Sequence, residues 1–163
     1  MNEKMRRLVV GNEKIESELP QSLTAILDAG ILRLHGALLF SALFRPSIEQ
    51  VLRQAAYYDL WGFEFSQNKF HLEDFVEENL IHHSLSFVEE FSSRYSPSMG
   101  GQIAFAVLSL SEDQEFGVQS TFSFYVQRDS QVVINFDKLD EFKEALLVKK
   151  IESDSYGADI SMH

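Results

Sequence analysis

The fold is decided by residues 117–127, which read GVQSTFSFYVQ. Apolar residues at Val118, Phe122, Phe124 and Val126 fall on one side of this stretch. The other side is a polar strip of Gln119, Thr121, Ser123, Tyr125 and Gln127. A period of two predicts a β-strand with one buried side and one solvent-facing side. We expect this strand to be the middle one of three antiparallel strands.

The segments around it extend the predicted sheet. Residues 102–110 are apolar at both sets of alternate positions, which predicts a central strand covered on both faces. Residues 131–136 predict a third strand after a tight turn. A C-terminal helix is expected to begin at Asp137, end near Lys150 and pack across one face of the sheet.

The first hundred residues predict helices and one small hairpin. Residues 7–10 favour a short edge strand, and Pro20 is well placed to begin a helix that ends before Gly30. Residues 31–44 are apolar on all sides, which is typical of a helix or of a buried strand, and their good helix formers favour the helix. Two aromatic runs around a polar turn predict a hairpin over residues 57–71.

A long helix is predicted over residues 72–95. Its apolar positions recur at spacings of three and four, and the inner face includes Val76, His83, Phe87 and Phe91. The predicted class is therefore α+β, with helices and a hairpin followed by an antiparallel sheet of at least three strands.

The length of 163 residues suits one globular domain with a substantial core. Residues 1–6 and 153–163 are predicted to be loose tails. The absence of cysteine excludes a disulfide framework, a thiolate zinc site and a cysteine nucleophile, and it suits a reducing cytoplasm. The most apolar run, residues 31–44, is too short to span a bilayer, so we expect no membrane partner.

The formal net charge is −11, from 25 acidic and 14 basic residues, and the excess of acid falls after residue 45. A nucleic-acid-binding protein would need a basic stripe, and the sequence has none. We therefore expect no direct binding to nucleic acid. An acidic surface attracts basic partners, although it also serves solubility alone.

No catalytic signature is present: the chain lacks a nucleophile elbow, a phosphate-binding loop and a zinc-protease motif. We expect no enzymatic activity, catalytic residue, cofactor or metal. One alternative is a small metal- or ligand-dependent enzyme, because Glu78 and His82 would share a helix face beside His83. Such a site needs further ligands, for which the sequence offers only His35, His71 and scattered acids. A second alternative is a general adaptor protein.

Acids near aromatic residues form the candidate binding set. Tyrosine and tryptophan are common interface anchors, and a rim of carboxylates suits a basic partner. The predicted partner-binding residues are Asp59, Trp61, Glu73, Glu77, Glu78, Glu112, Asp113, Glu115 and Tyr125.

In its size, its acidity and its lack of cysteine and of catalytic motifs, the chain resembles the immunity proteins of bacterial polymorphic toxin systems, including contact-dependent growth inhibition. The features behind the resemblance are the acidic runs at residues 112–115, 73–74 and 77–78. The resemblance implies a cytoplasmic antitoxin that binds one cognate toxin domain and covers its active site. The toxin domain is expected to be basic, such as a nuclease.

Overall fold

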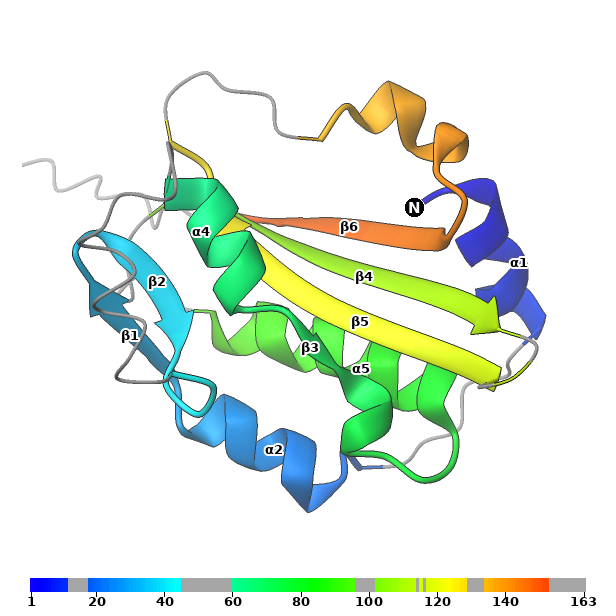
Figure 1. Cartoon of the computed structure of the whole chain (residues 1–163), viewed down its shortest axis with the longest axis horizontal. Coiled ribbons are helices and arrows are strands. Elements are labelled where there is room, and N and C mark those ends of the chain that lie inside the picture. The colour runs from blue at the N-terminus through cyan, green and yellow to red at the C-terminus, as the bar shows by residue number, and fades with distance from the viewer. Residues whose placement is uncertain are drawn as a thin grey trace, which may run out of the picture.

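Segments far apart in the sequence build a four-stranded antiparallel sheet in the order β3-β5-β4-β6 (Figure 1). The structure is a computed structural model that describes residues 1–11, 18–44, 60–95, 102–113, 115, 117–128 and 134–152. The strands are β3 (Phe70–His71), β4 (Ala104–Asp113), β5 (Gly117–Val126) and β6 (Ala145–Ile151). The predicted α+β class is confirmed.

The predicted pairing of the two long strands is also confirmed. β4 and β5 form a ten-residue antiparallel ladder in which Leu108 lies opposite Phe122, and β4 is the central, covered strand. Helix α5 (Leu80–Arg94) lies across the face of β5 that was predicted to be buried. Phe87 and Phe91 of this helix pack against Phe122 in the main core.

The opposite face of β5 is less exposed than predicted. Helix α4 (Leu60–Gln67) covers its C-terminal half (Figure 1), so that Ser123 and Tyr125 are only 2% exposed. The Ser123 hydroxyl donates to the Phe65 carbonyl at 2.6 Å, which satisfies this buried polar group. An alternating pattern shows which side of a strand is polar, but short polar side chains also fit under a helix. Gln119 and Thr121 remain half-exposed.

The predicted C-terminal helix is wrong. Its residues form a short 3-10 helix, η3 (Phe136–Glu141), followed by strand β6. The side chain of Asn135 accepts the Asp137 N–H, so the cap lies two residues before the predicted one. Residues 145–151 have no strong local preference, and pairing with β4 decides their conformation. Residues 131–133 of the predicted third strand, 131–136, lie outside the described residues, and residues 134–136 lead into η3 and form no strand.

Residues 31–44 are also corrected, from helix to strand. They contain an antiparallel hairpin of β1 (Ile31–Leu34) and β2 (Ala37–Phe40). The two residues between the strands have positive φ, 48° at His35 and 90° at Gly36, which is the geometry of a tight hairpin turn. The glycine was the available signal for this turn.

The aromatic residues before β3 form helix α4 instead of the predicted hairpin. Residues 57–59 of that prediction lie outside the described residues. The predicted 72–95 helix is confirmed only from residue 80, because η1 (Leu72–Asp74) and a bend precede it. Its expected inner face is correct, since His83, Phe87 and Phe91 are buried. Helix α2 (Gln21–Asp28) also forms where predicted, directly after Pro20.

The N-terminus is not a loose tail. Helix α1 (Glu3–Gly11) replaces both the predicted tail over residues 1–6 and the predicted strand over residues 7–10. Asn2 is 1% exposed, and its Oδ1 accepts the N–H groups of Met5 and Leu146. Its Nδ2 donates to the carbonyl of Glu144. The first residues thus close part of the free edge of β6. The predicted tail over residues 153–163 lies outside the described part.

We predict that Asn2→Ala destabilises the protein by about 2 kcal/mol, because it removes the acceptor of two buried N–H groups. Urea unfolding of the variant and the wild type measures the difference. Arg6→Ala is the control, since the exposed side chain of Arg6 pairs with the exposed carboxylate of Glu3. Equal stability of Asn2→Ala and wild type would contradict an ordered N-terminus.

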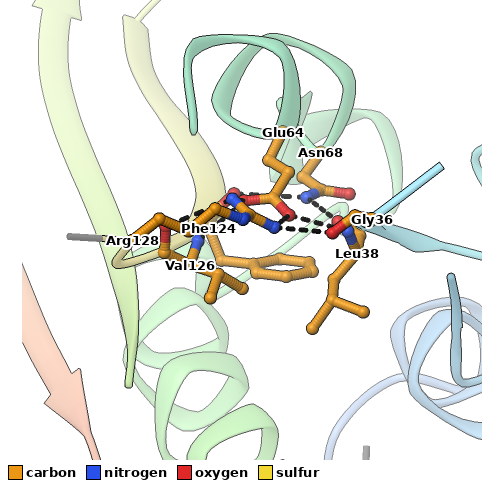
Figure 2. A network of polar contacts seen from close by, with 7 residues as sticks. All are labelled: Gly36, Leu38, Glu64, Asn68, Phe124, Val126 and Arg128. Atoms are coloured by element: carbon orange, nitrogen blue, oxygen red, sulfur yellow. Dashed lines mark hydrogen bonds and ion pairs between the residues drawn. The ribbon is translucent and has the colours of Figure 1, made fainter. Parts of the chain in front are cut away.

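The β1–β2 hairpin is joined to the main sheet by side chains of α4 (Figure 2). Asn68, directly after this helix, is fully buried. Its Oδ1 accepts the Phe40 N–H at 2.9 Å, and its Nδ2 donates to the carbonyls of Leu38 at 2.9 Å and Phe124 at 3.2 Å. One amide therefore bridges β2 and β5, which do not pair directly.

Glu64 forms a second bridge one turn earlier on α4. Its Oε1 accepts the Leu38 N–H at 2.7 Å, and its Oε2 accepts the Val126 N–H at 2.8 Å. The guanidinium of Arg128 contacts both carboxylate oxygens, at 2.5 and 2.9 Å, and also donates to the Gly36 carbonyl. The charge of Glu64 is tolerated at 0% exposure because it is paired and fully hydrogen-bonded.

Within the described residues, no helix is both long and apolar enough to cross a membrane.

Candidate partner-binding surface

Two acidic segments that are separate in the sequence meet at one end of the sheet. The first is residues 73–78, which run from η1 to the bend before α5, and the second is the end of the β4–β5 ladder, with Glu112 and Glu115. Oε2 of Glu73 accepts the Ser120 N–H at 2.9 Å. Two residues earlier on β5, Val118 lies opposite Glu112. The hydrogen bond thus places Glu73 two residues along β5 from the position opposite Glu112. We call residues 73–78 together with Glu112 and Glu115 the acidic end.

Glu73 orders this end of the molecule. Its side chain is 27% exposed, and its Oε1 lies 3.0 Å from Nδ1 of His71. With its other oxygen on β5, Glu73 fixes the short helix η1 against the sheet edge. Of the predicted binding residues, Glu73 thus has a structural role as well as a charge.

The other acids at this end are accessible to solvent. Asp74, Glu77, Glu78, Glu112 and Glu115 are all exposed. Asp113 is the last residue of β4, and the structure does not describe its side chain. Val118, which the sequence pattern had assigned to the core, is 38% exposed beside them.

The predicted aromatic anchors do not join this surface. Tyr125 is buried and stacked on Phe105, with ring centroids 5.4 Å apart, so its assignment as an exposed anchor is wrong. Burial raises the pKa of Tyr125 to about 12. Trp61 is half-buried on α4, where its ring centroid lies 6.0 Å from that of Tyr125. Asp59 lies outside the described residues.

A polar row crosses the open half of the sheet beside the acidic end. His71, Thr121 and Ser109 lie side by side in register on β3, β5 and β4. His71 is exposed, and the other two are half-buried. The sequence pattern indicated Thr121 but not its neighbours, because the short strand β3 is too brief to give a period. This row offers hydrogen-bond donors and acceptors next to the exposed carboxylates.

The geometry expected for a metal site is absent where it was proposed. Glu78 precedes α5 and is exposed, so it does not share a helical face with His82. His83 is 8% exposed, with its ring centroid 5.4 Å from that of His82. No group of three or more histidines and acids suited to a metal occurs among the residues that the structure describes.

We predict an acid-dependent loss of stability that originates at His83. Burial and, secondarily, the neighbouring His82 lower the pKa of His83 from its usual 6.5. Below about pH 6.5 the unfolded chain binds a proton that the folded chain resists, so the free energy of unfolding falls as pH drops toward the lowered pKa. The contribution to the slope is at most about 1.4 kcal/mol per pH unit.

Urea unfolding between pH 7.5 and 5.5 measures this slope in wild type, His83→Leu and His83→Gln. Both variants lack the titrating group, so both should give a flatter pH profile whatever their stability at pH 7.5. Variants with the wild-type slope would exclude His83 as the origin.

Together the fold and this surface define an α+β domain with a four-stranded antiparallel sheet and an acidic end. The chain belongs to the Uncharacterized protein PM0498 family, whose model matches residues 1–158. It is 31% identical over 104 residues to Uncharacterized protein PM0498 of Pasteurella multocida (strain Pm70), and the match spans 64% of each chain. No solved structure gives a significant match.

Proposed function

We propose that this chain is an immunity-type protein that binds one cognate, basic toxin domain, such as a nuclease, and neutralises it by covering its active site. The observation that supports the proposal best is the convergence of the two acidic segments on one ordered, exposed end of the sheet. Solubility requires only dispersed charge. Convergence held by a backbone-to-carboxylate hydrogen bond favours a binding surface.

The proposed mechanism is electrostatic. A nuclease presents a basic cleft that binds phosphate groups, and the carboxylates of Glu77, Glu78, Glu112 and Glu115 would occupy that cleft instead. Their field steers the encounter and raises the association rate. Val118 and the polar row across the sheet would supply short-range contacts that slow dissociation.

An adaptor would use the same surface but would accept several partners. A metal-dependent enzyme has less support, because Glu78 and His82 are not on one helical turn. Binding to a single partner with strict one-to-one stoichiometry favours the immunity-type function over the adaptor.

The test uses the C-terminal domain of the polypeptide encoded by the reading frame directly upstream, purified separately. We expect a one-to-one complex in size-exclusion chromatography with light scattering, and loss of the toxicity of that domain when both are expressed together. An upstream frame without a basic domain, or a domain that does not bind at micromolar concentration, would overturn the proposal.

A further inference from the structure

Two phenylalanines are exposed at the ends of η3, of which Phe136 is the first residue and Phe142 directly follows the last. Phe136 is 47% exposed and Phe142 is 44% exposed. Few large apolar side chains of the described residues are this accessible, and these two are the aromatic ones. Leu139, which lies between them, is buried against the sheet. The helix therefore has one face in the core, while an aromatic residue at each end faces solvent.

The backbone under these aromatic residues is fixed. Nζ of Lys4 donates to the carbonyls of Phe142 at 2.9 Å and Lys143 at 2.7 Å. The carboxylate of Asp140 accepts the Glu3 N–H at 2.7 Å. The ring of Phe136 lies 5.7 Å from that of Phe105. An ordered aromatic residue loses little conformational entropy on binding, which is the usual condition for an interface anchor.

The charge on η3 itself is mainly acidic, whereas Lys4 and Lys143 lie beside Phe142. Asp137, Asp140 and Glu141 are exposed on η3, and the one lysine of this helix, Lys138, lies 3.6 Å from Glu141. Apolar anchors inside a rim of carboxylates match a partner with an apolar patch inside a basic surface. This is the same chemistry that the acidic end offers.

The two surfaces are connected. Ala145, at the start of β6, pairs with Leu110, two residues before Glu112 at the acidic end. Between them lies an open groove of about 510 Å³, which is lined by the basic side chains of Lys4, Arg7 and Lys143 and by the acidic ones of Glu112 and Glu144. A single rigid partner could therefore contact η3 and the acidic end together.

We infer that residues 135–142 are a second docking element for the basic toxin domain, with Phe136 and Phe142 as its anchors. This inference rests on the proposed function and identifies the short-range part of the interface. The acidic end governs the encounter, and the two rings govern the lifetime of the complex.

Stopped-flow and calorimetric binding to the upstream-encoded C-terminal domain test the inference. Phe142→Ala and Phe136→Ala should each weaken the affinity by about tenfold or more, mainly through faster dissociation. Phe142→Leu should retain part of the affinity. Val10→Ala is the matched control, because Val10 is 85% exposed at the end of α1, and it should change the affinity less than about twofold.

The outcomes separate the two proposals. If the wild type does not bind, the proposed function fails and this inference fails with it. If the wild type binds and both alanine variants bind equally well with unchanged urea midpoints, the inference alone is overturned. A wild-type dimer that Phe142→Ala converts to a monomer would also overturn it, since the face would then serve self-association.

Discussion

Glu64→Gln should destabilise the protein by about 3 kcal/mol or more, because it leaves the Arg128 guanidinium without its buried counter-charge. The same change disturbs the acceptors of the Leu38 and Val126 N–H groups, which connect the β1–β2 hairpin to β5. Urea unfolding followed by tryptophan fluorescence measures the effect. The only tryptophan, Trp61, lies on α4 one turn before Glu64 and reports on this junction.

Two comparisons make this test specific. Glu89→Gln is the matched control, since Glu89 pairs with Lys149 but is 71% exposed, and it should cost less than about 0.5 kcal/mol. Arg128→Met should also be strongly destabilising, and the double variant Glu64→Gln/Arg128→Met should lose less than the sum of the two single losses. Additive single losses, or equal effects at Glu64 and Glu89, would refute the proposed junction.

The largest expected effect on binding comes from reversing one charge in each acidic segment. Glu77→Lys/Glu112→Lys should weaken binding to the upstream-encoded domain roughly 100-fold, because each change replaces an attraction with a repulsion at the contact. The association rate should fall roughly tenfold and should depend less on salt. Stopped-flow binding at several salt concentrations measures both quantities. Both residues are exposed, so the fold should be preserved.

The control has the same change in net charge at the other end of α5. Asp28→Lys/Glu90→Lys reverses the charges of two acids that contact Arg94. Arg94 is the last residue of α5 and lies about 20 Å along the helix from its first residue, Leu80. It should change the affinity much less than the first double variant does. Equal weakening by both variants would mean that net charge, not the acidic end, attracts the partner.

The long strands could be predicted from the sequence because their pattern is long and is tied to burial. Apolar and polar residues alternate along most of β5, and Phe122 and Phe124 face the core as expected, although α4 also buries Ser123 and Tyr125 on the polar side. Shorter elements failed for a physical reason. Residues 31–44 and 145–151 are compatible with helix and strand alike, so tertiary pairing decides their conformation. The turn at Gly36 is the one local signal that favoured a hairpin.

The sequence predicted which acidic residues belong to the candidate surface, but it did not predict how they are arranged in space. The acids at Glu77 and Glu112 were chosen from sequence, yet nothing in their spacing shows that Glu73 would bond to Ser120 and join the two segments. Tyr125 illustrates the opposite case, because its polar neighbours on the strand suggested exposure while α4 covers it. The exposure of Phe142 follows from the end of η3 and the start of β6. The sequence pattern had predicted one continuous helix over these residues.

The central claim is that the acidic end contacts a basic partner protein, and hydrogen–deuterium exchange tests it most directly. The exchange of the chain alone is compared with its exchange in a mixture with the upstream-encoded domain. We predict slower exchange in residues 71–78 and 112–120, with a second protected segment at 135–142. Protection confined to the β1–β2 hairpin and α2, or no protection anywhere, would contradict the claim.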